Sequence, residues 1–351
     1  MTKEVFLLHD ILKCTQKIVP EVLELLQKRY LILRTIYYNG PVGRRILANY
    51  LGLGERIVRT EINFLKSQNL IDISTPGMTL TPEGEEVVER LKDFIHELKG
   101  LSELEMYIKS SLSLKNVVIV PGNVDEDATV LSELGKAASS YVKDLMKDNS
   151  IIALTGGSTI KAVIDNVPKV SNLKNVLVVP ARGGMGRSVE VQANNLAANL
   201  AKKINANYKL LHIPDSLSSK ALSAVLNESD IKEIVDNISN SSILIYGIGR
   251  AEVMALRRGL SSEKIKELEK AGAVGEAFGY YFNNNGEIIY CASTIVVEHE
   301  ALKNIDNLIA VAAGASKGEA IIAAVKNIQN TTLITDEGAA KEIINIISKI
   351  E

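Results

Sequence analysis

The 351-residue chain lacks the features that mark several broad classes of protein. Its two cysteines, Cys14 and Cys291, are too few for a disulfide framework or a cysteine-rich zinc site. Its apolar runs stay well short of the roughly 18–20 residues that a membrane span needs. Its first residues do not show the charged, apolar and small-residue order of a secretory leader. We therefore expect a soluble, cytoplasmic protein with no membrane partner.

Strong net charge is also lacking, because 40 basic residues face 42 acidic ones and the formal net charge is −2. The balance hides an asymmetry. Residues 28–70 hold eight basic and two acidic side chains, so this segment carries +6 and the rest of the chain −8. A basic block in an acidic protein is typical of a surface that binds a polyanion such as nucleic acid, although charge runs are also common on plain solvated faces.

The basic block contains the pattern of a helix-turn-helix. Apolar residues at helical spacing predict a helix over 19–38, which Gly40 and the following proline end. Further along, Ala48, Gly52 and Val58 stand at the spacing that a helix-turn-helix requires. A small residue lets the two helices approach, a glycine turns the chain at positive φ, and a β-branched residue packs the second helix onto the first.

The second helix of this pattern has one apolar and one polar face. Its polar face holds arginine and asparagine, which read base edges in the major groove, together with hydroxyl residues. The run 70–81 alternates around Pro76-Gly77 and predicts a two-stranded wing. We expect a winged helix-turn-helix that binds operator DNA through Arg44, Arg45, Arg56, Arg59, Thr60 and Asn63. A helical hairpin with a basic surface and no ligand is the alternative.

Domain boundaries follow from changes in the pattern. We expect a DNA-binding domain over 1–89, a helical linker over 90–114 and a second domain over 115–351. Gly100 either kinks the linker or divides it into two helices. The linker serves as a dimer contact or as a simple connector, and its residues favour neither.

The second domain alternates short apolar runs with helical stretches. Strands that are apolar on both faces and alternate with helices predict an α/β fold with a doubly wound, mostly parallel sheet. The expected strands cover 117–120, 151–154, 176–179, 210–213, 243–246, 308–311 and 332–334. Such sheets bind ligands outside the carboxyl ends of their strands, so the loops after the strands are the candidate sites.

The loop after the expected strand 151–154 reads Thr155-Gly156-Gly157-Ser158-Thr159. Glycines let backbone amides approach an anion, and the following helix start adds partial positive charge. The loop matches neither Gly-x-x-x-x-Gly-Lys nor Gly-x-Gly-x-x-Gly, which argues against nucleoside triphosphates and dinucleotides. A tight turn without a ligand remains the alternative.

Four further loops add charge at strand ends. Each one alone is also explained as a turn or a surface charge, but together they predict a site for a phosphorylated polyol with two anionic ends. The contributing residues are Arg182, Gln192 in the helix after it, Arg257 or its neighbour Arg258, Glu276 between glycines, and Lys317 at a helix start.

These motifs together resemble the SorC family of sugar-responsive transcription regulators, and within it the members that control glycolytic operons. The segments that carry the resemblance are the winged helix-turn-helix, Thr-Gly-Gly-Ser-Thr, Pro-Ala-Arg-Gly-Gly, Tyr-Gly-Ile-Gly, Gly-Ala-Val-Gly-Glu and Ala-Gly-Ala-Ser-Lys. The resemblance implies a repressor whose effector is fructose 1,6-bisphosphate and whose DNA target lies upstream of a glycolytic operon. We further expect a homodimer or homotetramer, assembled through the effector-binding domain. The resemblance also implies effector contacts from Gly156, Gly157, Ser158, Thr159, Arg182, Gln192, Arg257, Glu276 and Lys317.

The second domain also resembles glucosamine-6-phosphate deaminases and related isomerases, which makes a sugar-phosphate enzyme the alternative function. Those enzymes carry Gly-x-Gly-x-Asp-Gly-His, whereas this chain has Gly-Ile-Gly-Arg-Ala-Glu-Val over 247–253. The acid–base histidine is missing there, and the four histidines, His9, His96, His212 and His299, lie outside the candidate loops. We therefore expect no catalytic residue, no metal and no cofactor.

Overall fold

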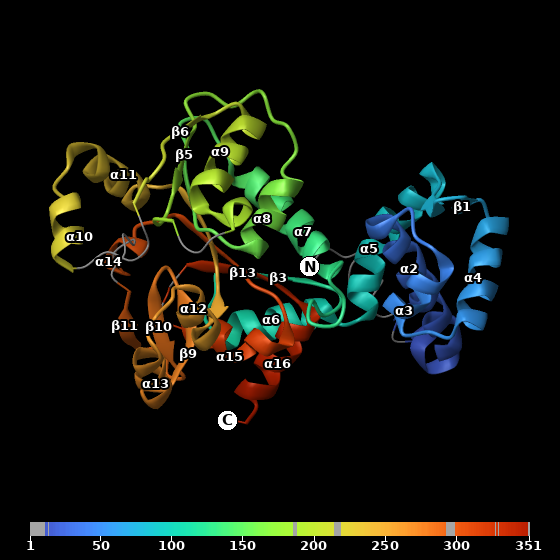
Figure 1. The fold of residues 1–351 in the computed structure, drawn as a ribbon. Coiled ribbons are helices and arrows are strands. Elements are labelled where there is room, and N and C mark those ends of the chain that lie inside the picture. The colour runs from blue at the N-terminus through green and yellow to red at the C-terminus, as the bar shows by residue number, and fades with distance from the viewer. Residues whose placement is uncertain are drawn as a thin grey trace. The chain divides into compact units, whose positions relative to one another are not determined.

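The computed structural model describes residues 11–12, 14–184, 188–213, 219–292, 299–326, 328 and 330–349, three of them (219, 222 and 299) by backbone alone. The chain divides into two compact units, Met1–Ser102 and Glu103–Glu351 (Figure 1). Among the described residues, no helix is both long and apolar enough to cross a bilayer.

The N-terminal unit is a winged helix-turn-helix, as the sequence predicts. Its elements are α2 (Pro20–Asn39), α3 (Arg44–Leu51), α4 (Glu55–Ser67), the antiparallel strands β1 (Ile71–Ser74) and β2 (Gly77–Leu80), and α5 (Pro82–Leu98). Gly52 turns the chain between α3 and α4 at φ 60°. Gly77 in the wing has φ 141°, and a Cβ there would come within 2.8 Å of the Val42 backbone nitrogen. Val58 and Ile62 of α4 are fully buried against the other helices.

Gly100, at φ 66°, divides the expected linker into two helices, α5 and α6 (Leu101–Ser111). Ile95 of α5 belongs to the apolar core of the N-terminal unit. In the C-terminal unit, Glu105 of α6 accepts a hydrogen bond from the Ile119 amide at 2.7 Å. The segment expected as a helical linker is thus two helices, and Ile95, Leu101 and Ile108 on them are buried.

The main sheet of the C-terminal unit is parallel throughout, which confirms the predicted α/β class. Within the described ranges it has seven strands, in the order β3 (Asn116–Val120), β13 (Thr331–Asp336), β12 (Asn307–Val311), β7 (Ile243–Gly247), β4 (Ile151–Leu154), β5 (Leu177–Pro180) and β6 (Asn207–Tyr208). Figure 1 shows α7 (Val130–Leu145), α8 (Ser158–Asn166) and α9 (Ala193–Ile204) on one side of the sheet, and α15 (Gly318–Val325) and α16 (Glu337–Ile347) on the other.

One predicted strand is wrong. The run Leu210–Ile213 is not a strand, and the edge strand β6 lies just before it. Leu211 is held by the Asn194 side chain, which donates to its carbonyl at 3.0 Å and accepts from its amide at 2.9 Å. A side chain thus replaces a neighbouring strand, so the apolar run is buried without a sheet ladder.

A second, antiparallel sheet was not predicted. It has the order β11 (Ile288–Cys291), β10 (Tyr280–Asn283), β9 (Ala273–Ala277) and β8 (Gly249–Arg250). Helices α12 (Ala251–Arg257) and α13 (Ser262–Lys270) pack with it. Its strands are too short for a clear period-two pattern, which explains why the sequence shows only turns there. The described ranges also include α10 (Ser219–Val225), α11 (Ser229–Ser239), α14 (His299–Leu302), the 3-10 turns η1 (Val189–Val191) and η2 (Ala315–Lys317), and helical residues at 11–12 and 14–18.

Candidate functional site

A cavity of about 240 Å³ opens at the carboxyl ends of β4, β5 and β7, where the main sheet meets the second sheet. Of the nine predicted effector residues, eight line it: Gly156, Gly157, Ser158, Thr159, Arg182, Arg257, Glu276 and Lys317. Gln192 is not among the lining residues. It precedes α9 as its N-terminal cap rather than lying within the helix as expected, and a Cβ on Gly184 would lie 3.6 Å from its Oε1.

The loop between β4 and α8 offers an uncapped helix N-terminus. Gly157 precedes α8 at φ 124° and provides no side chain to cap it. Gly156 has no room for a side chain, because a Cβ there would come within 2.5 Å of the Val191 carbonyl oxygen. The first amides of α8 are therefore free to meet an anion, with the helix dipole adding partial positive charge.

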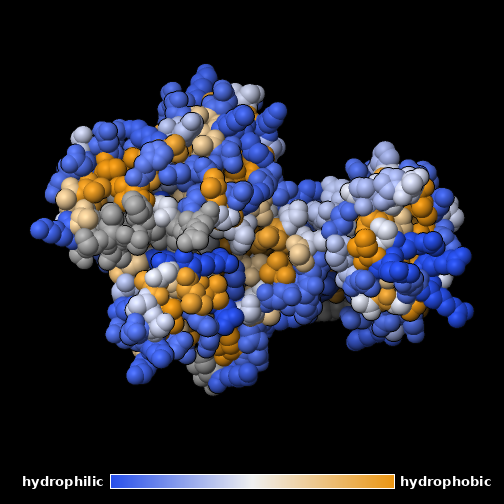
Figure 2. Space-filling view, viewed as in Figure 1, coloured by the Kyte–Doolittle hydropathy of each residue, from blue (hydrophilic) through white to orange (hydrophobic). Residues whose placement is uncertain are grey.

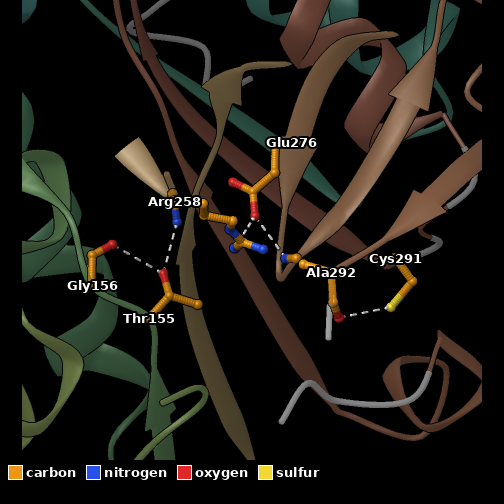
Figure 3. Close-up of polar contacts among 8 residues, drawn as sticks. Thr155, Gly156, Arg258, Glu276, Cys291 and Ala292 are labelled. Carbon is orange, nitrogen blue, oxygen red and sulfur yellow. Dashed lines mark hydrogen bonds and ion pairs between the residues drawn. The ribbon is translucent and has the colours of Figure 1, made fainter. Parts of the chain in front are cut away.

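Thr155 fixes this loop to the neighbouring strand. Its Oγ1 accepts a hydrogen bond from the Gly247 amide at 3.2 Å and donates to the Gly156 carbonyl at 3.4 Å (Figure 3). The glycine loop after β4 and the glycine loop after β7 are thus held together at one end of the cavity.

Positive charge prevails among the ionisable residues of the lining. In the described part of the chain, Arg182, Arg250, Arg257 and Lys317 line the cavity against one carboxylate, Glu276. Burial lowers the pKa of Lys317, and the positive charge of Arg257 lowers it further, while Asp125 and Asp336 act in the opposite direction. The like charges of Arg257 and Lys317 therefore repel each other, which an anionic ligand would relieve.

The structure separates the roles of the two adjacent arginines. Arg257 lines the cavity, whereas Arg258 caps the end of α12 and forms a buried ion pair with Glu276. Arg258 Nη2 lies 2.8 Å from Glu276 Oε1, which also accepts from the Gly279 amide at 2.7 Å (Figure 3). The side chains of the pair are only 2% and 3% exposed.

Sequence reasoning missed two aspartates that shape the loop before Lys317. Asp336 accepts from the Gly314 amide at 3.0 Å, and Asp125 accepts from the Ser316 amide at 2.8 Å. The Lys317 amide donates to the Gly314 carbonyl at 3.0 Å, so Lys317 can meet an anion there only through its side chain. The sequence could have indicated Asp336, because an aspartate between a strand and a helix is typical of an N-terminal cap. In the structure it caps α16 by accepting from the Ala339 amide.

The predicted DNA-contacting residues lie together on the N-terminal unit. Arg56, Arg59, Thr60 and Asn63 are exposed on α4, and a shallow hollow beside them is lined by Gly43, Arg44, Arg45, Ile46, Glu55, Arg56 and Arg59. Hydrophilic side chains gather over α4 in the space-filling view (Figure 2). Thr60 Oγ1 donates to the Arg56 carbonyl at 3.1 Å, and Arg45 pairs with Glu55 at 3.2 Å on the open surface.

Part of the basic block is used inside the unit. Lys28 and Arg29 both pair with Glu61 of α4, at 2.7 and 2.8 Å, and the Arg29 guanidinium lies 3.7 Å from the centre of the Phe64 ring. Burial opposes ionisation of Glu61, but hydrogen bonds and charge from Lys28 and Arg29 outweigh it and lower the pKa of Glu61. The charge available to a polyanion is therefore smaller than the sequence count of the block suggests.

Comparison with known proteins agrees with this architecture. The family model "CggR N-terminal DNA binding domain" matches residues 25–95, and the model "Putative sugar-binding domain" matches residues 96–345. The chain is 42% identical over 337 residues to the central glycolytic genes regulator of Bacillus subtilis (strain 168), covering 96% of this chain and 99% of that protein.

Solved structures share the fold. The SorC family transcriptional regulator of Enterococcus faecalis is 35% identical with a TM-score of 0.64, covering 69% of this chain and 99% of that one. The full-length sorbitol operon regulator SorC of Klebsiella pneumoniae, at 19% identity, shares the fold with a TM-score of 0.63, covering 91% of this chain and 99% of that one. These relatives are regulators, so the enzyme alternative is rejected. The chain belongs to the SorC family of transcriptional regulators, with a DNA-binding domain of the CggR type followed by a sugar-binding domain.

Proposed function

We propose that this regulator is a repressor of a glycolytic operon and that fructose 1,6-bisphosphate releases it from DNA. The name of its relative in Bacillus subtilis supports the target genes. The effector is a ligand rather than a catalytic cofactor, and the protein needs no other small molecule. It acts in the cytoplasm, where its operator DNA lies.

The observation that carries the effector proposal is the chemistry of the cavity. A single space is lined both by the uncapped N-terminus of α8 and by cations that include Arg257 and Lys317. These two kinds of anion-binding group in one cavity support a ligand with two phosphates. A buried carboxylate, Glu276, is suited to the hydroxyls of a sugar.

The proposed contacts follow from this division. One phosphate binds at Gly156, Gly157, Ser158 and Thr159, and Arg182 lies in the same lining. The other phosphate meets Arg257 and Lys317, and Glu276 accepts from a sugar hydroxyl. Gln192, at the start of α9 and outside the described lining of the cavity, turns toward the ligand when it binds.

Operator binding uses the exposed face of α4. A homodimer or homotetramer presents two such helices to operator half-sites, and Arg44, Arg45, Arg56, Arg59, Thr60 and Asn63 meet phosphates and bases. Effector binding changes how the subunits are arranged and thereby weakens this contact. Coupling of this kind is typically about 1–3 kcal/mol and is reciprocal, so operator DNA should weaken effector binding by the same factor.

Fluorescence anisotropy on labelled DNA from upstream of the neighbouring glycolytic operon tests the proposal. The expected result is tight binding that fructose 1,6-bisphosphate releases and that fructose 6-phosphate, the control, leaves in place. Tight binding with no response to the bisphosphate would contradict the proposed effector, and the absence of specific binding would contradict the proposed operator. An Arg182→Ala variant should bind DNA normally and lose the response.

A further inference from the structure

The buried ion pair of Arg258 and Glu276 places a positive charge next to the one carboxylate among the described residues that line the cavity. A carboxylate in a site for a bisphosphate repels the ligand, and yet Glu276 is part of the lining. Arg258 lies directly behind it, 2.8 Å from Oε1, and the two side chains are almost completely buried. The pair as a whole is close to neutral, so Glu276 can remain ionised without adding net negative charge to the cavity.

The same contacts orient the carboxylate. Oε1 is occupied twice, by Arg258 Nη2 and by the Gly279 amide at 2.7 Å. No described group donates to Oε2. Figure 3 shows Oε1 directed at the Arg258 guanidinium and the Gly279 amide, with the second oxygen on the other side of the carboxylate, and Glu276 lines the cavity. Oε1 is thus fixed by Arg258 and Gly279, and Oε2 remains as a hydrogen-bond acceptor for a donor in the cavity.

The turn that supplies the Gly279 amide is itself held in place. Phe278 has φ 57° and Gly279 has φ 99°, so β9 and β10 are joined by a tight turn with two positive φ values. A positive φ is unfavourable for a bulky residue. The Phe278 ring, which also lines the cavity, packs 4.3 Å from the fully buried Tyr246 ring. This packing keeps the Gly279 amide aimed at Glu276 Oε1.

We propose that Arg258 is a positioning residue that makes effector recognition depend on ligand hydroxyls. It holds Glu276 ionised and fixes Oε1. Oε2 then accepts a hydrogen bond from a polyol hydroxyl, whereas a ligand with phosphates and no hydroxyls forms no hydrogen bond with it. This inference rests on the proposed function, because it assumes that a sugar bisphosphate occupies the cavity.

Isothermal titration calorimetry on the full chain tests it with two probes. Fructose 1,6-bisphosphate carries hydroxyls, and hexane-1,6-diol bisphosphate has two phosphates on six carbons without any. In the unmodified protein we expect the sugar bisphosphate to bind about 10- to 100-fold more tightly, the range for one hydrogen bond to a charged group. Arg258→Met should reduce this preference at least tenfold, and Arg258→Lys, which restores the charge, should recover part of it.

Arg250→Met is the matched control, because Arg250 lines the same cavity and is 49% exposed. It should weaken both ligands by the same factor and leave the preference unchanged. Thermal melting monitored by circular dichroism shows which variants are folded. If Arg258→Met is unfolded, the ligand preference of Arg258→Lys tests the inference instead.

Two outcomes would overturn the inference. Folded Arg258 variants could keep the wild-type preference, or they could lose both ligands to the same extent as the Arg250 control. Failure of the unmodified protein to bind fructose 1,6-bisphosphate is a separate result, which would overturn the proposed function and this inference with it.

Discussion

Asp336 and Gly314 join the last strand of the main sheet to the loop that carries Lys317. Both carboxylate oxygens of Asp336 lie 3.0 Å from the Gly314 amide. The same carboxylate accepts from the amides of Val124, at 2.7 Å, and Ala339, at 2.9 Å. One fully buried side chain therefore fixes two loops and the start of a helix at the edge of the cavity.

Replacing this carboxylate should affect both stability and effector binding. Asp336→Asn puts an amide nitrogen where backbone donors converge, which should cost about 1–3 kcal/mol of unfolding free energy. The loop before Lys317 should loosen, and effector affinity should fall. Urea unfolding and calorimetry measure the two effects. Asp148→Asn is the control, because Asp148 is exposed and accepts from a single amide, at 2.8 Å from Lys174; equal effects of both changes would contradict the role of Asp336.

Gly156 should tolerate no side chain. The Cβ of a Gly156→Ala variant would lie 2.5 Å from the Val191 carbonyl oxygen, so the loop before α8 must shift. We expect a loss of effector binding of at least tenfold with unchanged operator affinity, because the DNA-binding unit is untouched. Gly184→Ala, whose Cβ would meet no described atom closer than 3.6 Å, should behave as the unmodified protein. Normal effector binding by Gly156→Ala would show that the α8 amides are not used.

Glu61 should make the stability of the DNA-binding unit fall at low pH. Its pKa is lowered below the ordinary value of 4.5, so its ion pairs stabilise the folded state above pH 4.5 and lose this effect as the pH falls through the lowered pKa. Glu61→Gln should therefore be less stable at pH 7, and its difference from the unmodified protein should shrink in strong acid. Denaturant unfolding at a series of pH values measures this, and a difference independent of pH would argue against the ion pairs.

Two basic residues of the same unit should behave differently toward DNA. Arg59 is exposed on α4, whereas Lys28 is paired with Glu61. Arg59→Met should weaken operator binding and lower the salt slope of the affinity by about 1 if Arg59 meets a phosphate. Lys28→Met should leave the slope unchanged and reduce stability instead. Anisotropy titrations across salt concentrations separate the two, and a slope unchanged from the unmodified protein in both variants would place neither residue at a phosphate.

Several features could be read directly from the chain. The helix-turn-helix depends on the local requirements of Ala48, Gly52 and Val58, and the structure shows Gly52 at positive φ and Val58 buried as expected. Six of the seven expected parallel strands are present, because a strand buried on both faces must be apolar along its whole length. The glycine loop before α8 could be predicted for a similar reason, because a helix start whose amides are to approach an anion favours glycine over residues with side chains.

The sequence by itself therefore determined the two-domain plan, the fold class and the loops from which the cavity is built, because each depends on local preferences or on simple burial. The tertiary structure alone decided that Arg257 and not Arg258 lines the cavity, that Asp125 and Asp336 hold the loop before Lys317, and that Lys28 and Arg29 pair with Glu61. Side-chain direction and pairing across the chain depend on how distant segments pack. The short strands of the second sheet, which place Glu276 against Arg258, carry no periodic signal of their own.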